Sequence, residues 1–168
     1  FTDGSTMKHP GKPFVYGVAC YPEKHEEAPN LEQDLRYLKM KQDLGATFAV
    51  TQLFYDNEKF YNFVDQARKI GVTIPIIPGI KPFAKLSQLN VVPKTFHCDI
   101  PEELAGLALK CNSDEEARLL GIEWAVKQVK DLYVHGFNNV HFYTVSAVSS
   151  VHEVMKRLEE SGLLQKNS

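Results

Sequence analysis

The sequence lacks the features that would place a chain of this size in a secreted, membrane or zinc-binding class. It has three cysteines, Cys20, Cys98 and Cys111, and their spacing forms no Cys-x-x-Cys pair, which argues against a disulfide framework and a zinc knuckle. No apolar run approaches the ~20 residues that span a bilayer. The N-terminus lacks the basic and then apolar layout of a signal peptide. We therefore expect a soluble cytoplasmic protein with no membrane partner.

An excess of one charge sign is also missing. The chain has 19 Lys and Arg residues against 21 Asp and Glu residues, a formal net charge of -2 and a sequence pI of about 6.3. Without a basic stripe to neutralise phosphates, nucleic acid is not an expected partner.

Several short catalytic and binding motifs are absent as well. There is no GxGxxG or GxxxxGK[ST] phosphate loop, no HExxH zinc motif and no GxSxG nucleophile elbow. Residues 97–99 read His-Cys-Asp, but three consecutive side chains cannot easily converge on one ion, so no metal is predicted.

What the chain does contain is enough apolar residue for one core. Of its 168 residues, 43% are hydrophobic, and a chain of this length buries about 70% of its unfolded surface when it folds. Residues 1–13 are polar and carry glycines and prolines, so they are predicted to form an extended lead-in or linker. Residues 14–168 are predicted to form one domain.

This domain shows a repeated alternation of strand and helix patterns. Apolar runs predict strands at 14–20, 48–53, 74–78 and 139–144, and the first looks buried on both faces. Helices are predicted after each strand, with caps at Asn30, Asn57 and Ser113, and glycine stops at 45, 71, 136 and 162. Pro78-Gly79 closes the third strand in this interpretation and opens a long insertion.

Such alternation implies right-handed crossovers and a parallel sheet, either open and doubly wound or part of a closed barrel. Polar side chains favour the barrel, because they follow the strands, where barrel enzymes build their sites. They are Tyr21, Glu23, His25, Gln52, Lys81, Tyr143 and Thr144. The predicted fold class is therefore α/β, part of a (β/α)8 TIM barrel.

Each candidate residue also has an ordinary structural explanation. Loop 21–29 resembles any solvated connection, although Tyr21 could offer a flat face and His25 a hydrogen-bond donor to a cofactor. Asp34 and Lys41 lie seven residues apart on one helix face, as in a solvated charged stripe. Gln52 ends an apolar run, where a buried amide needs partners or a ligand.

Read together, the segments GVACYPEKHEEAP, TQLFYD, PIIPGIKP and HFYT, with Asp34 and Lys41 between the first two and an Ile-Pro pair at 100 and 101, resemble the methylenetetrahydrofolate reductase family. The similarity covers about residue 14 to the C-terminus. It implies a flavoprotein that passes a hydride from NAD(P)H through FAD to 5,10-methylenetetrahydrofolate, giving 5-methyltetrahydrofolate for methionine synthesis.

The resemblance also implies roles for particular residues. Ala19, Tyr21 and His25 would line the flavin, and Asp34 and Lys41 would serve its ribityl and phosphate side. Gln52 and Gln88 would face the folate substrate or the nicotinamide, which alternate on the flavin face. The flavin itself supplies the chemistry.

Two departures from the family pattern qualify these roles. The family usually has Asn and Arg after HFYT, the Arg near the folate tail, whereas Thr144 here is followed by Val-Ser-Ala, with Ala147 in place of the Arg. The resemblance also implies that this chain contains only the last four strand-helix units of the (β/α)8 barrel. The family's general-acid Glu, on the first barrel strand, therefore has no counterpart, and this chain alone is expected to be inactive.

A sheet of only four strands has two unpaired edges, and this leads to two further expectations. Bare sheet edges favour association, so we expect a homo-oligomer, or edges covered by residues 1–13. The alternative function is a non-catalytic half-barrel that binds flavin or folate and self-associates. A flavin-free barrel methyltransferase would want a metal cluster that the sequence does not offer.

Overall fold

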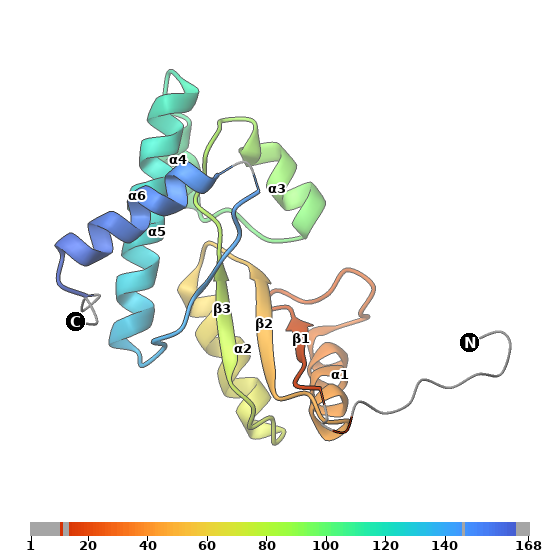
Figure 1. The fold of residues 1–168 in the computed structure, drawn as a ribbon. Coiled ribbons are helices and arrows are strands. Elements are labelled where there is room, and N and C mark those ends of the chain that lie inside the picture. The colour runs from red at the N-terminus through yellow and green to blue at the C-terminus, as the bar shows by residue number, and fades with distance from the viewer. Residues whose placement is uncertain (1–10, 12–13, 146, 164–168) are drawn as a thin grey trace, which may run out of the picture.

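The computed structural model describes residues 11, 14–145 and 147–163, and their strands form one parallel sheet. The strands are β1 (Gly17–Cys20), β2 (Phe48–Leu53), β3 (Ile76–Ile80) and β4 (His141–Phe142), adjacent in that order (Figure 1). The prediction of four adjacent parallel strands is confirmed. The predicted lead-in, apart from Gly11, lies outside the described residues.

The predicted end of the sheet is also confirmed. Cys20 pairs with Thr51, and Leu53 pairs with Gly79, so Tyr21, Gln52 and Gly79 lie at the carboxyl ends of neighbouring strands. These three positions come together because parallel strands present the same end to the same side of the sheet.

The first strand differs from its prediction. It begins at Gly17 rather than at residue 14, and its only buried residue is Cys20. Phe14 and Val15 are 76% and 77% exposed, so the expectation of burial on both faces is wrong. The reason is position, since β1 is an end strand of the described sheet and pairs there with β2 alone.

The third and fourth strands also have different bounds from those predicted. β4 has two residues rather than six, and β3 continues through Pro78 and Gly79 instead of ending there. Gly79 donates its N–H to Thr51 Oγ1 at 2.8 Å. A Cβ at Gly79 would lie 2.4 Å from the Thr51 carbonyl oxygen and 2.7 Å from the Tyr143 ring. A glycine is therefore required here by close packing within the protein.

Six helices connect or follow these strands in the described part of the chain. They are α1 (Leu31–Asp43), α2 (Asn57–Lys69), α3 (Gln88–Phe96), α4 (Glu102–Ala108), α5 (Asp114–Val134) and α6 (Val148–Glu160). The predicted caps of α1 and α5 are confirmed, because Asn30 accepts from Gln33 N at 2.8 Å and Ser113 accepts from Glu116 N at 3.2 Å.

The cap of α2 was predicted one residue too late. Asp56 is the cap and accepts from Glu58 N at 3.0 Å, whereas Asn57 is the first helical residue. The Asn57 amide instead donates to Gln128 O and to Asp131 Oδ2 of α5, at 3.0 and 2.7 Å. Asp56 and Asn57 can both cap a helix, and the sequence does not show that the Asn57 side chain is bound to α5 instead.

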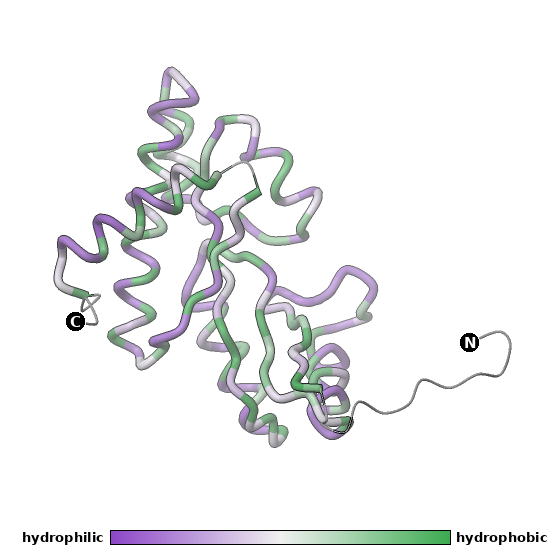
Figure 2. Tube along the Cα trace, in the orientation of Figure 1, coloured by the Kyte–Doolittle hydropathy of each residue, from purple (hydrophilic) through white to green (hydrophobic). Residues whose placement is uncertain are grey.

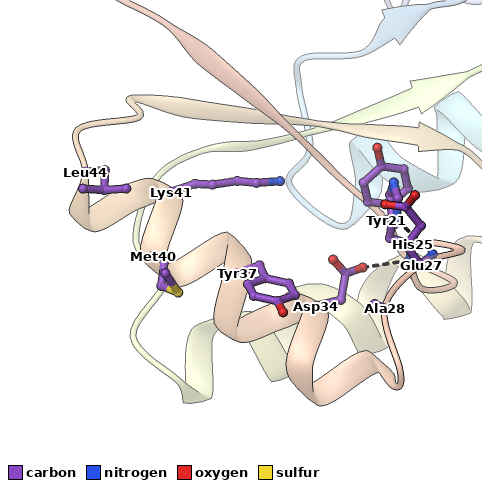
Figure 3. Close-up of a pocket in the computed structure, with 9 residues that line it drawn as sticks. All are labelled: Tyr21, His25, Glu27, Ala28, Asp34, Tyr37, Met40, Lys41 and Leu44. Atoms are coloured by element: carbon purple, nitrogen blue, oxygen red, sulfur yellow. Dashed lines mark hydrogen bonds between the residues drawn. The ribbon is translucent and has the colours of Figure 1, made fainter.

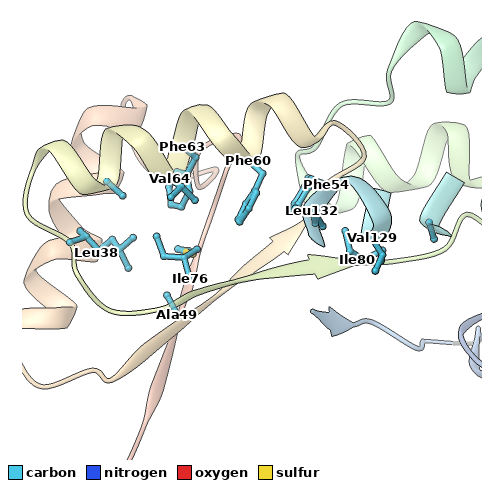
Figure 4. Close-up of a cluster of buried hydrophobic side chains, with 14 of the residues drawn as sticks. Leu38, Ala49, Phe54, Phe60, Phe63, Val64, Ile76, Ile80, Val129 and Leu132 are labelled. Atoms are coloured by element: carbon cyan, nitrogen blue, oxygen red, sulfur yellow. The ribbon is translucent and has the colours of Figure 1, made fainter. Parts of the chain in front are cut away.

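Two hydrophobic clusters hold the elements together. The first is formed by residues of the sheet and of helices α1, α2, α5 and α6, and it includes Phe60, Phe63 and Ile80 (Figure 4). The second joins α3, α4 and the start of α5 through Phe83, Leu104 and Ala117. Hydrophobic residues lie along β2 and β3, whereas the 21–29 loop is largely hydrophilic (Figure 2). Within the described residues, none of the helices combines the length and the apolar character needed to cross a membrane.

Candidate functional site

A cavity of about 450 Å³ lies between the loop after β1 and the exposed face of α1 (Figure 3). Four of the five residues predicted to contact a cofactor line it, and they are Tyr21, His25, Asp34 and Lys41. The sequence placed these residues in two groups, a polar loop and a helix face. The structure brings them together, because the short loop folds back onto the first turns of the helix.

The loop is held to the helix by a specific hydrogen bond. His25 N donates to Asp34 Oδ2 at 2.8 Å, and Asp34 is 7% exposed. Lys24 adopts φ 82°, which is uncommon for a residue with a Cβ. Its ammonium group donates to Ala28 O at 2.7 Å, which closes the loop. These two bonds hold the backbone of the loop against α1.

The two aromatic groups of the loop stand edge to face. The Tyr21 and His25 ring centroids are 4.5 Å apart, with planes at 84°. His25 Nδ1 accepts from Glu27 N at 3.2 Å, so a neutral imidazole carries its proton on Nε2 and can donate from there. Burial, followed by the charge of Asp34, raises the pKa of the Tyr21 phenol, so Tyr21 stays neutral near pH 7.

The helix side of the cavity offers an acceptor and a cation. Lys41 Nζ donates to Ala19 O at 3.1 Å, which connects the fifth predicted residue to the site through its backbone. An ammonium group has three N–H donors, so two remain for a ligand. The second oxygen of Asp34, Oδ1, accepts no hydrogen bond from the described residues, and Asp34 and Lys41 are separated by about 10 Å of helix rise.

Gln52 lies beside this cavity and Gln88 does not line it. Gln52 shares a small hollow with Tyr21, His97 and Cys98, and its Oε1 accepts from Leu53 N at 2.9 Å, which leaves its NH₂ free to donate. Gln88 begins α3, and its Oε1 accepts from Ala84 N at 2.6 Å. Gln88 therefore shapes the turn before α3 in this structure.

Sequence reasoning missed part of the cavity lining. Tyr37 and Met40 line it between Asp34 and Lys41, and Glu27, Ala28 and Leu44 complete it. The available signal was helical spacing, because Tyr37 lies three residues after Asp34 and four before Lys41. Tyr37 is 45% exposed on the helix face that carries Asp34 and Lys41, so it could have been predicted as a lining residue.

The thiol at the end of β1 is not suited to nucleophilic chemistry. Cys20 is 3% exposed, and burial raises its pKa to about 12, only partly offset by Lys41. A thiol with such a pKa is protonated near neutral pH and is a poor nucleophile.

The lining of the cavity is suited to an elongated ligand, because aromatic rings lie at one end and a cation lies at the other.

Comparison with known proteins identifies relatives of this chain. The family model described as methylenetetrahydrofolate reductase matches residues 5–159. A probable methylenetetrahydrofolate reductase (NADPH) of Caenorhabditis elegans is 36% identical over 88% of this chain and 23% of its own length. The 5,10-methylenetetrahydrofolate reductase of Escherichia coli is 37% identical over 79% of this chain and 45% of its own length. The chain thus spans about a quarter to a half of these relatives.

A structural comparison finds the same type of fold in a distant protein. An uncharacterised protein from Clostridium thermocellum, which binds two copies of 5-methyl-5,6,7,8-tetrahydrofolic acid, superposes with a TM-score of 0.57. It is 16% identical, and the match covers 89% of this chain and 54% of that one. At this identity the similarity concerns the fold alone.

Proposed function

This chain belongs to the methylenetetrahydrofolate reductase family, and from that membership we propose that it forms the flavin-holding part of a reductase. The reaction is the reduction of 5,10-methylenetetrahydrofolate to 5-methyltetrahydrofolate with FAD and NAD(P)H, a step of one-carbon metabolism that supplies methionine synthesis. The observation that carries the proposal is the cavity in which Tyr21, His25, Asp34 and Lys41 converge. When bound there, the flavin would accept a hydride from the nicotinamide and deliver it to the folate.

The groups around the cavity fit the parts of such a cofactor. Tyr21 and His25 offer ring surfaces and an N–H donor to the flavin ring. Asp34 keeps one carboxylate oxygen for a ribityl hydroxyl. Lys41, beside the Ala19 carbonyl, keeps two N–H donors for a phosphate oxygen. The order of these groups along α1 suits a ligand that is aromatic at one end and anionic further along.

We assign the folate substrate to the side of Gln52 and Gln88, where it alternates with the nicotinamide. Support for Gln52 comes from its place beside Tyr21 and from its free amide donors. Support for folate as a ligand comes from the distant protein of similar fold that binds 5-methyltetrahydrofolic acid. The relatives include an Arabidopsis thaliana reductase named with NADH and the worm enzyme named with NADPH, so the proposal leaves the nicotinamide as NAD(P)H.

We further propose that the sheet is the second half of a (β/α)8 barrel, acting in the cytoplasm. Its two end strands, β1 and β4, would pair with further strands of a longer enzyme or with a second copy of the chain. A proton donor for the folate iminium is implied by the family resemblance and has no counterpart here, and losing a general acid costs about 10²- to 10⁴-fold in rate. The 168-residue chain should therefore bind FAD but not reduce the folate.

The direct test is a titration of the native chain and of Lys41→Met with FAD, in which binding is monitored by quenching of flavin fluorescence. A hydrogen bond to a charged group contributes about 1.5–3 kcal/mol, so Lys41→Met should weaken FAD binding about 10- to 100-fold. Lys39→Met is the matched control, because Lys39 lies on the same helix and pairs with Asp43 at 2.5 Å. Equal affinity in Lys41→Met and Lys39→Met would remove Lys41 from the site.

A second measurement separates the reductase from a binding module without turnover. FAD bound to the chain is reduced, and its reoxidation by 5,10-methylenetetrahydrofolate is followed by stopped-flow absorbance. We expect no reoxidation by the isolated chain, and reoxidation in a longer family enzyme that contains it, where Gln52→Ala should slow this step without releasing FAD. Rapid reoxidation by the chain alone would contradict the claim that it lacks the general acid. If the flavin of the longer enzyme is not reoxidised by the folate either, the non-catalytic binding module is favoured.

A further inference from the structure

A partly buried ion cluster joins the 21–29 loop to α2 and to the segment after α3. Lys59 of α2 donates to Glu23 Oε2 at 2.6 Å and also contacts Asp99 Oδ2. The backbone N–H of Asp99 donates to the same Glu23 oxygen at 3.0 Å. The ammonium group of Lys59 therefore joins α2 to two segments that lie 36 and 40 residues away in sequence.

The burial of the three members is unequal. The Glu23 side chain is 10% exposed, that of Lys59 is 33% and that of Asp99 is 79%. Glu23 Oε1 is buried and has no hydrogen-bond partner among the described residues. Glu23 is thus a carboxylate that depends on Lys59, whereas Asp99 can be solvated by water.

The ionisation of the cluster is consistent with this inequality. Burial raises the pKa of Glu23 even though Lys59 and the Asp99 N–H act to lower it. The bond to Lys59 lowers the pKa of the more exposed Asp99. Burial acts to lower the pKa of Lys59, but its bonds to Asp99 and Glu23 outweigh this and raise it. Lys59 is therefore charged near neutral pH, and it is what keeps Glu23 charged in a buried place.

The cluster connects the two sides of the proposed site. Glu23 lies in the same loop as Tyr21 and His25, which face the cavity next to α1. Asp99 follows α3, whose first residue is Gln88. Between them, Tyr21, Gln52 and Cys98 line one small hollow. Displacing Glu23 would therefore move the flavin-side loop relative to the segment that follows α3.

We propose that Lys59 is a positioning residue for the flavin site, which holds Glu23 so that Tyr21 and His25 face the cavity beside Asp34. This rests on the proposed function, since the ligand read out is FAD. Lys59 lines a different cavity, on the α3 and α4 side, and does not line the one beside α1. Its effect on FAD therefore passes through the loop.

The proposal predicts a particular pH dependence. The titratable groups that face Glu23 are Lys59 of α2, with Asp99 and Cys98 after α3. In Lys59→Met the charged form of Glu23 loses its cation, so its pKa rises further above the ordinary value. At low pH Glu23 is neutral and stays buried. As pH rises through that raised pKa, Glu23 ionises and leaves its place, so FAD binding by Lys59→Met weakens with rising pH.

The experiment measures the FAD dissociation constant of the 168-residue chain and its variants from about pH 5.5 to about pH 8. We expect Lys59→Met to bind FAD about tenfold more weakly than the native chain at the upper end, and within about twofold at the lower end. Lys59→Arg should bind nearly as the native chain does, because it restores the cation. The double variant Glu23→Gln with Lys59→Met should recover affinity and lose the pH dependence, because the buried group is then neutral.

The matched control is the other pair that joins these segments. His97 Nε2 lies 3.0 Å from Glu26 Oε2, and the two side chains are 43% and 66% exposed. Glu26 lines neither the cavity beside α1 nor the hollow that contains Gln52. Glu26→Gln should therefore change FAD affinity by less than about twofold, because exposed pairs contribute little.

A readout without flavin separates this proposal from the proposed function. Hydrogen exchange of the Asp99 amide, which donates to Glu23, should accelerate in Lys59→Met at pH 8 by about tenfold relative to the native chain, and recover in Lys59→Arg. If the native chain binds no FAD, the proposed function fails while this exchange still tests the cluster. An unchanged Asp99 amide, an equal loss of FAD affinity at every pH, or a double variant no better than Lys59→Met would overturn the positioning role.

Discussion

The two hydrophobic clusters of this protein are built from different kinds of sequence. The first lies between the strands and the helices that alternate with them, and its members recur at strand and helix spacing. The second joins Leu53 and Tyr55, at the end of β2, to the start of α5 and to the segment between β3 and α5, which contains no strand among the described residues. The first cluster sets the sheet, and with it the direction of every strand end. The second places the segment containing Gln88 and Asp99 next to those ends.

The clusters also differ in their polar content. The second contains Tyr55, which is 2% exposed and whose hydroxyl has no hydrogen-bond partner among the described residues. Its burial raises the pKa of this phenol well above the ordinary value, so the group is neutral. The first cluster thus supports the sheet, and the second supports the segment beside the site. Mutations in each cluster can therefore separate their contributions to stability.

The largest effect should come from the first cluster. Phe60 is fully buried, stacks on Phe54 at 5.1 Å and meets Phe137 edge-on at 4.7 Å. Phe60→Ala should cost about 3–5 kcal/mol of unfolding free energy, a large part of the stability of a domain this size. Urea unfolding followed by circular dichroism measures it. A cost below about 1 kcal/mol would mean that this cluster does not set the fold.

A smaller effect should mark the contact between the two regions. A Cβ at Gly121 of α5 would lie 1.6 Å from the Phe83 carbonyl oxygen, so α5 touches the backbone that follows β3. Gly121→Ala should destabilise the chain by about 1–3 kcal/mol or more. Gly106→Ala in α4 is its control, since nothing lies within 4 Å of that Cβ, and a helical alanine should stabilise by about 0.5–1 kcal/mol. Equal responses of the two variants in thermal unfolding would contradict this packing.

The smallest effect concerns the polar atom in the second cluster. Tyr55→Phe removes a buried hydroxyl that makes no bond to the described residues, so it should leave stability unchanged or raise it by about 1 kcal/mol. Tyr143→Phe is the contrast, because the Tyr143 hydroxyl donates to Thr51 O at 2.8 Å and its loss should cost about 0.5–1.5 kcal/mol. Destabilisation of Tyr55→Phe in the same urea assay would show that this hydroxyl has a partner.

The sequence predicted what depends on local spacing. Strand order, the Asn30 and Ser113 caps and the shared face of Asp34 and Lys41 follow from periodicity and capping chemistry, and the structure agrees. The exposure of Phe14 and Val15 could not be predicted, because an apolar run does not say whether its strand has neighbours on both sides.

Other features depend on contacts between distant segments. Lys59 lies 36 residues from Glu23, and nothing local marks it as a partner. Tyr37 was available from helical spacing and was missed. Gln88 accepts a hydrogen bond from Ala84 N through Oε1, and its place on the substrate side, which the family resemblance implies, stays a prediction. Contacts between distant segments, such as that of Lys59 with Glu23, depend on tertiary placement, which local spacing does not encode.

The central claim is that FAD binds between the 21–29 loop and α1, and not in the region of the second cluster. The most direct test is titration of isotope-labelled chain with FAD, followed by backbone amide chemical shifts. We predict that shifts concentrate at residues 19–28 and 34–44, while those of α4 and residues 109–117 stay within experimental error. Shifts confined to α4 and the second cluster, or no saturable shifts at all, would contradict the account.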